Sequence, residues 1–343
     1  MGHSSVDDST EVPSTGVLST GVPSTLRTVR PDGTPVYRYR QRPGVPPVWV
    51  TRFDTAAAHA HLPPDHRHAH DFFVLVYVEE GAGSFTVDGA ERPLRAGDVH
   101  AVPPGQVIGV ASVTGLAHSR AWSVAFTPDA VPALASVSPL AWAHHPLLAL
   151  FAPGAGPCRA AEPGRASWSG WMAELAEELA DPDRLGAHEA VAALLTRILV
   201  AAARLAPPAP GTPDPLVDRV FAEIEERFRE PVSAADVARA LGYTPGHLTT
   251  VLRRRTGRPL LEWITERRMT EVRRMLRETD LPLDAVAART GLRDATYLVR
   301  RFRARYGTTP QRWRRTMASP AESVQVDLRR RTPDMYVGRR SAG

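Results

Sequence analysis

The segment "AADVARALGYTPGHLTTVLRRRTG", residues 234–257, recurs in altered form as "LDAVAARTGLRDATYLVRRFRARYG", residues 283–307. In each copy an alanine stands four residues before a glycine, and an arginine-rich stretch follows that ends at a second glycine. The alanine allows two helices to approach closely, and the first glycine suits a turn that needs a left-handed backbone. Each copy therefore predicts a helix-turn-helix unit. The alanine and glycine pairs are Ala238 with Gly242 and Ala287 with Gly291.

The stretch between the two copies, "LLEWITERRMTEVRRMLRET", has the apolar period of a single amphipathic helix. A helix of about 20 residues is about 30 Å long. Two recognition helices held apart by such a spacer could enter successive major grooves, which lie about 34 Å apart on one face of DNA.

The basic charge of the chain is concentrated in this region. Residues 214–317 contain 22 arginines and 14 acidic residues, whereas the whole chain of 343 residues has a net charge of only +5 and a pI near 9.8. All 42 basic residues are arginine, so every cationic contact uses a guanidinium, which suits bidentate recognition of phosphate and guanine. This charge asymmetry is typical of a nucleic-acid-binding module.

The repeated region resembles the DNA-binding domain of the AraC/XylS family of bacterial transcription regulators. The similarity extends over both copies and the helix between them, and "GTTPQRWRR", residues 307–315, resembles the closing signature of that family. The resemblance implies a sequence-specific regulator, commonly an activator, that binds double-stranded promoter DNA and acts with RNA polymerase.

The second helix of each unit would turn one side to the core and the other to DNA. We expect Leu248, Val251, Leu252, Leu298 and Phe302 on the core side. The family's contact positions imply four base-contacting residues: Thr249, Thr250, Thr296 and Arg300. Five arginines are assigned to phosphates, which give affinity without sequence information: Arg253, Arg254, Arg301, Arg303 and Arg314. A solvated or internally paired role remains open for each arginine.

The N-terminal half is predicted to be rich in strands. From about residue 36 to residue 127, short apolar runs such as "FFVLVYV", "DVHAV" and "RAWSVAF" are separated by Gly and Pro. This spacing favours a β-sandwich or barrel. The segment resembles the cupin barrel that many AraC/XylS regulators carry as an effector-binding domain.

Three histidines, His66, His68 and His70, alternate along one of these strands and raise the question of a metal site. The metal-binding motif of cupins, laid on this sequence, matches His68, His70 and Gly81 but places Val74 at its glutamate. The second part of the motif expects a further histidine shortly after a Pro-Gly pair, and this sequence has Val107 and Ile108 there. Successive same-face residues of one strand are nearly 7 Å apart, a poor geometry for three ligands. We therefore favour no metal and no cofactor over a metal with unusual ligands, and expect His68, His70 and Trp122 to bind a small effector, with His100 and His118 as weaker candidates.

The remaining segments complete an α+β chain of two domains. The helical run near residues 165–205 carries a stripe of Trp168, Trp171, Leu175 and Leu179, which fits core or subunit interface. The expected organisation is a disordered arm (1–30), a cupin-like effector-binding barrel (31–130), a helical dimerisation segment (131–205), a Pro-rich linker (206–215), an AraC-type double helix-turn-helix domain (216–317) and a basic disordered tail (318–343).

We expect a cytoplasmic, effector-controlled transcription regulator that acts as a homodimer. No signal peptide is recognisable, the most apolar run is broken by Arg197, and the lone Cys158 excludes an internal disulfide. The alternative is a cupin metalloenzyme, an isomerase or dioxygenase, with an appended helical domain. A third possibility is DNA packaging without sequence preference.

Overall fold

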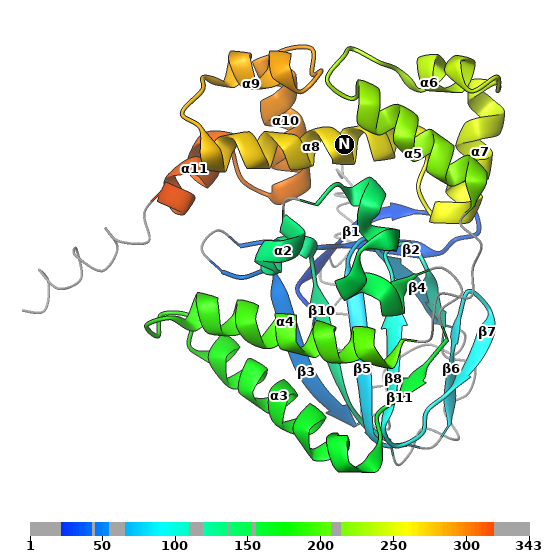
Figure 1. Ribbon diagram of the computed structural model, residues 1–343, viewed down its shortest axis with the longest axis vertical. Coiled ribbons are helices and arrows are strands. Elements are labelled where there is room, and N and C mark those ends of the chain that lie inside the picture. The colour runs from blue at the N-terminus through cyan, green and yellow to red at the C-terminus, as the bar shows by residue number, and fades with distance from the viewer. Residues whose placement is uncertain are drawn as a thin grey trace, which may run out of the picture.

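The computed structural model describes residues 22–42, 45–54, 66–81, 83–109, 119–135, 137–152, 156–206 and 214–318. Strands dominate the described part of the N-terminal half, and every element described from residue 215 onward is a helix (Figure 1). The predicted α+β architecture is therefore confirmed. Within the described ranges, no helix is both long enough and apolar enough to cross a membrane.

Two sheets face each other in the N-terminal half. One has the strand order β1-β2-β4-β9-β6-β7 and the other the order β11-β8-β5-β10-β3. All pairs are antiparallel except β2 with β4. The strands are β1 Ser24–Val29, β2 Pro35–Tyr39, β3 Val48–Asp54, β4 Arg67–His70, β5 Phe73–Glu80, β6 Ser84–Val87, β7 Ala90–Pro93, β8 Asp98–Val102, β9 Val107–Gly109, β10 Arg120–Phe126 and β11 Cys158–Arg159.

The central strand β5 is buried on both sides, and alternate residues enter different cores. Val74 packs between the two sheets with residues of β2, β6 and β8. Phe73, Leu75 and Tyr77 point the other way, into a core that the five-stranded sheet shares with helices. Because successive side chains of a strand alternate between its faces, one continuous apolar run can supply both cores.

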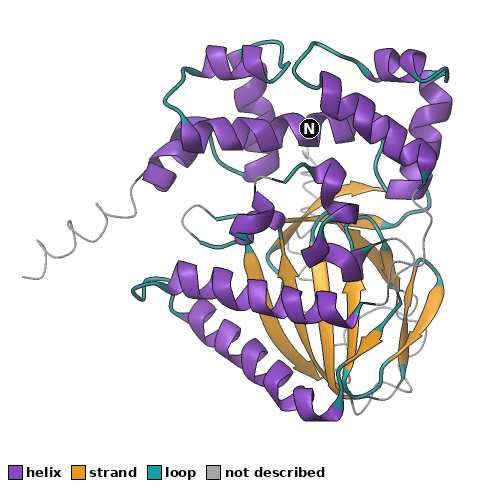
Figure 2. Ribbon diagram, in the orientation of Figure 1, coloured by secondary structure: helices purple, strands orange, loops and turns teal. Residues whose placement is uncertain are grey.

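Helices α3 (Glu162–Ala180) and α4 (Ala187–Leu205) cover the outer face of the five-stranded sheet (Figure 2). Trp168 stacks on Tyr77 with ring centroids 5.5 Å apart, and Leu175 and Leu195 are fully buried. The apolar stripe of α3 therefore packs against the chain's own sheet. Short helices η1 (Pro128–Ala130), α2 (Pro132–Ala135), η2 (Pro139–His144) and η3 (Pro146–Phe151) lead from β10 towards this layer.

The first strand differs from the expected irregular arm. We expected residues 1–30 to be disordered, yet Ser24–Val29 form β1, an edge strand paired with β2. The segment has no strong apolar period because both of its faces are largely exposed, so its partner strand determines its conformation. Val22, just before β1, is also buried. Residues 1–21 of the arm, most of the Pro-rich linker and the tail after residue 318 lie outside the described residues.

The C-terminal third contains seven helices among its described residues. They are α5 Pro215–Arg227, α6 Ala234–Ala240, α7 Pro245–Thr256, α8 Leu260–Glu278, α9 Leu283–Arg289, α10 Ala295–Tyr306 and α11 Pro310–Ala318. This bundle lies against one end of the sheets (Figure 1). Polar contacts join the two parts: Ser138 donates to Glu225 at 2.8 Å, and Arg27 pairs with Glu262 at 2.5 Å.

Candidate nucleic-acid interface and sensor site

The first helix-turn-helix unit is built from α6 and α7. Ser233 and Asp236 form the capping box at the start of α6, and Thr244 caps α7 by accepting the His247 N–H at 3.4 Å. Gly242, between the helices, has φ of 78°, which a residue with a side chain rarely adopts. The local sequence thus determines where each helix begins and how the chain turns between them.

The second unit repeats this design with α9 and α10. Gly291 takes the turn with φ of 68°, and Asp294 caps α10 by accepting the Tyr297 N–H at 2.6 Å. The recognition helices α7 and α10 each have 12 residues and end at a glycine with positive φ, Gly257 or Gly307. The two predicted units are therefore present with matching lengths.

Helix α8 carries both units at its two ends (Figure 1). Its first half, through Trp263 and Ile264, belongs to the core of the first unit, and its second half, through Val272 and Leu276, belongs to the core of the second. Nineteen residues correspond to about 28 Å of helix. The spacer expected from the sequence is thus confirmed as one unbroken helix.

The recognition helices turn their predicted faces to the core and to solvent. Leu248, Leu252, Leu298 and Phe302 are fully buried, and Val251 is half-buried. Among the expected base contacts, Thr250, Thr296 and Arg300 are exposed, and Thr249 is half-buried. Side chains of both helices are therefore accessible to a bound duplex.

The arginines of the domain fall into two groups by their partners. Those of α8 are engaged: Arg274 pairs with Glu271 at 2.8 Å, and Arg268 donates to the carbonyl oxygen of Phe228 at 2.8 Å. In the described part of the chain, Arg253, Arg254 and Arg303 on the recognition helices have no acidic partner. Guanidinium groups without internal partners can exchange water for phosphate at little cost.

Of the remaining arginines of α10, Arg305 pairs with Glu266 at 2.9 Å, and the other two rest on an aromatic ring. Arg300 and Arg301 lie 5.4 and 5.2 Å from the ring centroid of Tyr297, and Arg301 Nε donates to the Tyr297 hydroxyl at 2.9 Å. Such contacts restrict the guanidinium without neutralising it. Tyr297 is not among the residues predicted from the sequence, although its position one turn before Arg300 and Arg301 could have indicated it.

Arg314 differs from the other predicted phosphate contacts. Its Nη2 donates to the carbonyl oxygen of Leu281 at 2.7 Å, and its side chain is half-buried between α11 and the turn before α9. The structure therefore gives Arg314 a role in holding α11 to the second unit.

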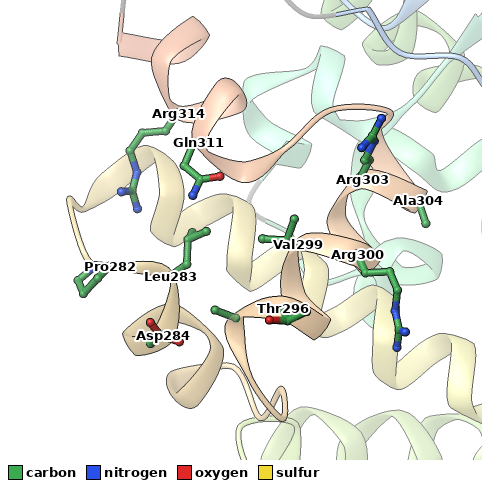
Figure 3. A pocket seen from close by; sticks show the side chains of 11 residues that line it. Pro282, Leu283, Asp284, Thr296, Val299, Arg300, Arg303, Ala304, Gln311 and Arg314 are labelled. Atoms are coloured by element: carbon green, nitrogen blue, oxygen red, sulfur yellow. The ribbon is translucent and has the colours of Figure 1, made fainter.

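A groove of about 1010 Å³ runs beside α10. Thr296, Val299 and Arg300 of α10 line it together with Leu283 of α9 and Gln311 of α11 (Figure 3). Two of the expected base contacts thus lie in a concave surface that also contains an apolar side chain. Val299 can contact a thymine methyl group from this position.

In the N-terminal part, His68 and His70 lie on β4 as predicted, and His66 directly precedes the strand. The ring centroids of His66 and His68, and of His68 and His70, are 5.1 Å apart. Burial lowers the pKa of His70 to about 4 and that of His68 well below its usual value, so both rings are neutral at neutral pH. Neither Nδ1 has a hydrogen-bond partner among the described residues.

The positions that lack metal ligands are filled by packing. Val74 is 6% exposed, and Ile108 is half-buried in the same cluster between the sheets. Within the described ranges, no three His, Cys, Asp or Glu side chains are grouped as a metal site would need.

The structure does not bring Trp122 together with the two histidines. Its side chain belongs to the outer core beneath α3, and its indole N–H donates to Glu79 at 2.9 Å. His100 instead shares the inner face of the five-stranded sheet with Val76 and Val102, is 1% exposed, and has both ring nitrogens unpartnered among the described residues. Alternation along "DVHAV" could have placed His100 on the same face as Val102. His118 lies outside the described residues.

Comparisons with known proteins match both halves of the chain. The family described as "Helix-turn-helix domain" matches residues 237–316, and the family described as "AraC-like ligand binding domain" matches residues 52–152. The multiple antibiotic resistance protein MarA of Escherichia coli is 31% identical over 93 residues, which are 27% of this chain and 73% of MarA.

Two further similarities are found. The HTH-type transcriptional activator AarP of Providencia stuartii is 30% identical over 99 residues, 29% of this chain and 73% of AarP. The structure of apo ToxT from Vibrio cholerae covers 79% of this chain and 97% of its own, with 11% identity and a TM-score of 0.33.

Proposed function

The chain belongs to the AraC family of DNA-binding transcriptional regulators, and on this premise we propose that α7 and α10 recognise one promoter site together, under the control of a small effector. The observation that carries the proposal is the distribution of arginines. Five arginines of the recognition helices have no acidic partner among the described residues: Arg253, Arg254, Arg300, Arg301 and Arg303. Arg255 and Arg305 of these helices pair with Asp214 and Glu266, and the arginines of α8 are all engaged. A duplex would therefore meet free positive charge on the two helices that also expose the base-contacting side chains.

Within this proposal, Thr249, Thr250, Thr296 and Arg300 contact bases. Arginine can bind guanine through O6 and N7, and threonine can hydrogen-bond a base or contact a thymine methyl group. The phosphate contacts are Arg253, Arg254, Arg301 and Arg303.

We propose that the barrel senses an effector and catalyses no reaction. The relatives are regulators, and the apolar Val74 and Ile108 occupy positions where a cupin enzyme would carry ligands. His68 and His70 are the proposed polar contacts of the effector. The domain boundaries, the homodimer, the cytoplasmic location, transcription activation and contact with RNA polymerase complete the proposal as expectations from the family.

Selection of binding sites from random duplexes, followed by affinity measurement, tests the base contacts. Arg300→Ala should weaken binding to the selected site by about tenfold to a hundredfold, because one bidentate contact is worth about 1–3 kcal/mol of discrimination. Binding to random DNA should weaken much less. The control is Arg204→Ala, which removes the same charge from the exposed end of α4. An equal loss on both DNAs would show that Arg300 contacts only phosphate.

A further inference from the structure

One aromatic side chain of the second recognition helix, Tyr297, contacts three arginines. The centroid of its ring lies 5.9, 5.4 and 5.2 Å from the guanidinium carbons of Arg293, Arg300 and Arg301. The ring is half-buried against the core of the second unit, whereas the three arginines are exposed. These four residues are called the Tyr297 cluster below.

The place of Tyr297 is fixed by the way α10 begins. Its backbone N–H donates to one oxygen of the N-cap Asp294 at 2.6 Å, and Arg293 Nε donates to the other oxygen at 2.7 Å. The Tyr297 N–H and the Arg293 guanidinium hold the pKa of Asp294 below its usual value, so the carboxylate is ionised at neutral pH. The helix start and the first guanidinium of the cluster therefore share one anchor.

The other two guanidiniums are held by the ring but keep their charge. Arg301 Nε donates to the Tyr297 hydroxyl at 2.9 Å, and neither Arg300 nor Arg301 has an acidic partner among the described residues. A π face attracts a cation without neutralising it. An exposed arginine loses rotamer freedom when it binds, and a side chain that is already restricted loses less. The ring thus prepares both arginines for a ligand.

The equivalent position in the first unit has different surroundings. His247 is the third residue of α7, as Tyr297 is of α10, and the N–H of each donates to its N-cap residue. The His247 ring stacks on Tyr243, with centroids 5.6 Å apart. One turn later, α7 has Thr250 where α10 has Arg300. Among the described residues, an aromatic ring that holds arginines is therefore present on α10 and absent from α7.

Arg300 connects the cluster to the groove beside α10. It lines this groove together with Thr296 and Val299, which lie on the same side of the helix (Figure 3). A guanidinium binds guanine through O6 and N7 at once only if its plane and direction fit the base edge. Contact with Tyr297 limits the directions in which Arg300 can extend from the helix.

We propose that Tyr297 is a positioning residue, which holds Arg300 for a bidentate contact with guanine and Arg301 for a neighbouring phosphate. The guanine preference of the protein then lies in the DNA segment under α10. This proposal rests on the proposed function, because it assigns to one helix a base preference and the residue that makes it possible.

A double-mutant cycle in the full chain tests the contact between the ring and Arg300. Its readout is the affinity ratio of two duplexes: the selected site, and the same site with adenine in place of the guanine whose preference Arg300→Ala abolishes. Tyr297→Leu removes the ring and keeps an apolar side chain. It should lower the ratio about twofold to fivefold, the factor equivalent to an exposed cation–π contact of about 0.5–1 kcal/mol. In the Arg300→Ala background, Tyr297→Leu should leave the ratio unchanged.

Two further variants separate positioning from a structural role. Tyr297→Phe keeps the ring and loses only the hydroxyl, so it should retain the ratio of the unchanged protein. His247→Leu makes the matched change at the same position of α7 and should also retain it. The salt dependence of binding should be the same in Tyr297→Leu as in the unchanged protein, because no charge is removed.

Three results would overturn the proposal: equal loss of affinity for both duplexes in Tyr297→Leu, a fall in the ratio that persists in the Arg300→Ala background, or the same fall in Tyr297→Phe. The variant Arg300→Ala by itself judges the proposed function. If it abolishes a guanine preference that Tyr297→Leu leaves intact, α10 reads guanine without help from the ring, and only the positioning role is refuted.

Discussion

The two turn glycines have the same backbone conformation but different surroundings, and this difference predicts different costs of substitution. At Gly242 an added Cβ would meet no atom within 4 Å. At Gly291 it would lie 2.5 Å from the carbonyl oxygen of Glu230 and closer still to that of Phe228. Both atoms belong to the backbone between α5 and α6, so they cannot rotate away.

The expected magnitudes follow from these geometries. A left-handed backbone costs a residue with a Cβ about 1–2 kcal/mol, and this is the whole expected effect of Gly242→Ala. Gly291→Ala adds the cost of forcing packed atoms apart, about 1–3 kcal/mol, for a total of about 2–5 kcal/mol. The second unit would also move relative to the first, because its turn packs directly on the first unit's connection.

Hydrogen exchange of the α8 amides in the full chain measures this difference, since exchange reports the free energy of local opening. Protection should fall more in Gly291→Ala than in Gly242→Ala. Affinity for a selected DNA site should also fall in Gly291→Ala, although this residue is not a base contact. Equal loss of protection in the two variants would refute the reasoning that backbone contact at Gly291 holds the units together.

Two further predictions concern a buried ion pair and the buried histidines of the sensor domain. Asp71→Asn should lower the free energy of unfolding of this domain by about 3 kcal/mol or more, because it leaves the charges of Arg27 and Arg38 uncompensated. Urea unfolding should show a lower midpoint, whereas the exposed Asp280→Asn should not change it. The free energy of unfolding should fall as pH drops from about 6.5 towards 4, because His70 and His100 bind protons in the unfolded chain but not in the folded one, where their pKa values are about 4. Each histidine contributes up to about 3 kcal/mol to this loss. Urea unfolding at a series of pH values measures it, and the same pH slope in His100→Phe as in the unchanged protein would contradict the prediction.

The DNA-binding domain could be predicted from its sequence because its signals are local. The capping residues Ser233 and Thr244 and the glycine turns act over three or four neighbouring positions. The apolar period then determines which side of α7 and α10 is buried. The repetition of the pattern identified both units, and α8 followed as the stretch between them.

The sensor site could be predicted only in part. The strand alternation placed His68 and His70 correctly on one face of β4. It could not show that Trp122 belongs to the opposite face of the other sheet, because that depends on how two sheets and two helices stack. Strand β1 was missed for a related reason: its pairing partner, β2, and not its own composition, determines its structure.

The contacts between the two domains could not be predicted from sequence patterns. Arg27 pairs with Glu262, which is 235 residues away in the chain, and Arg258 donates to the backbone oxygen of Asp71, which is 187 residues away. Nothing near these residues in the chain indicates a partner. Their composition is that of ordinary surface residues, and only the folded arrangement shows that they meet.

The arginine surplus itself leads to the last prediction, the salt dependence of DNA binding. Each neutralised phosphate contributes about −0.9 to the slope of log affinity against log salt concentration. Of the domain's 22 arginines, four on the recognition helices are the proposed phosphate contacts, so the slope should be about −4 and not about −20. Arg254→Gln should make the slope about one unit shallower. Arg314→Gln should leave the slope unchanged and lower stability, because Arg314 bonds to Leu281. A slope near −10 for the full chain, measured between about 50 and 200 mM salt, would mean that internally paired arginines also contact DNA and that ion pairing does not define the interface.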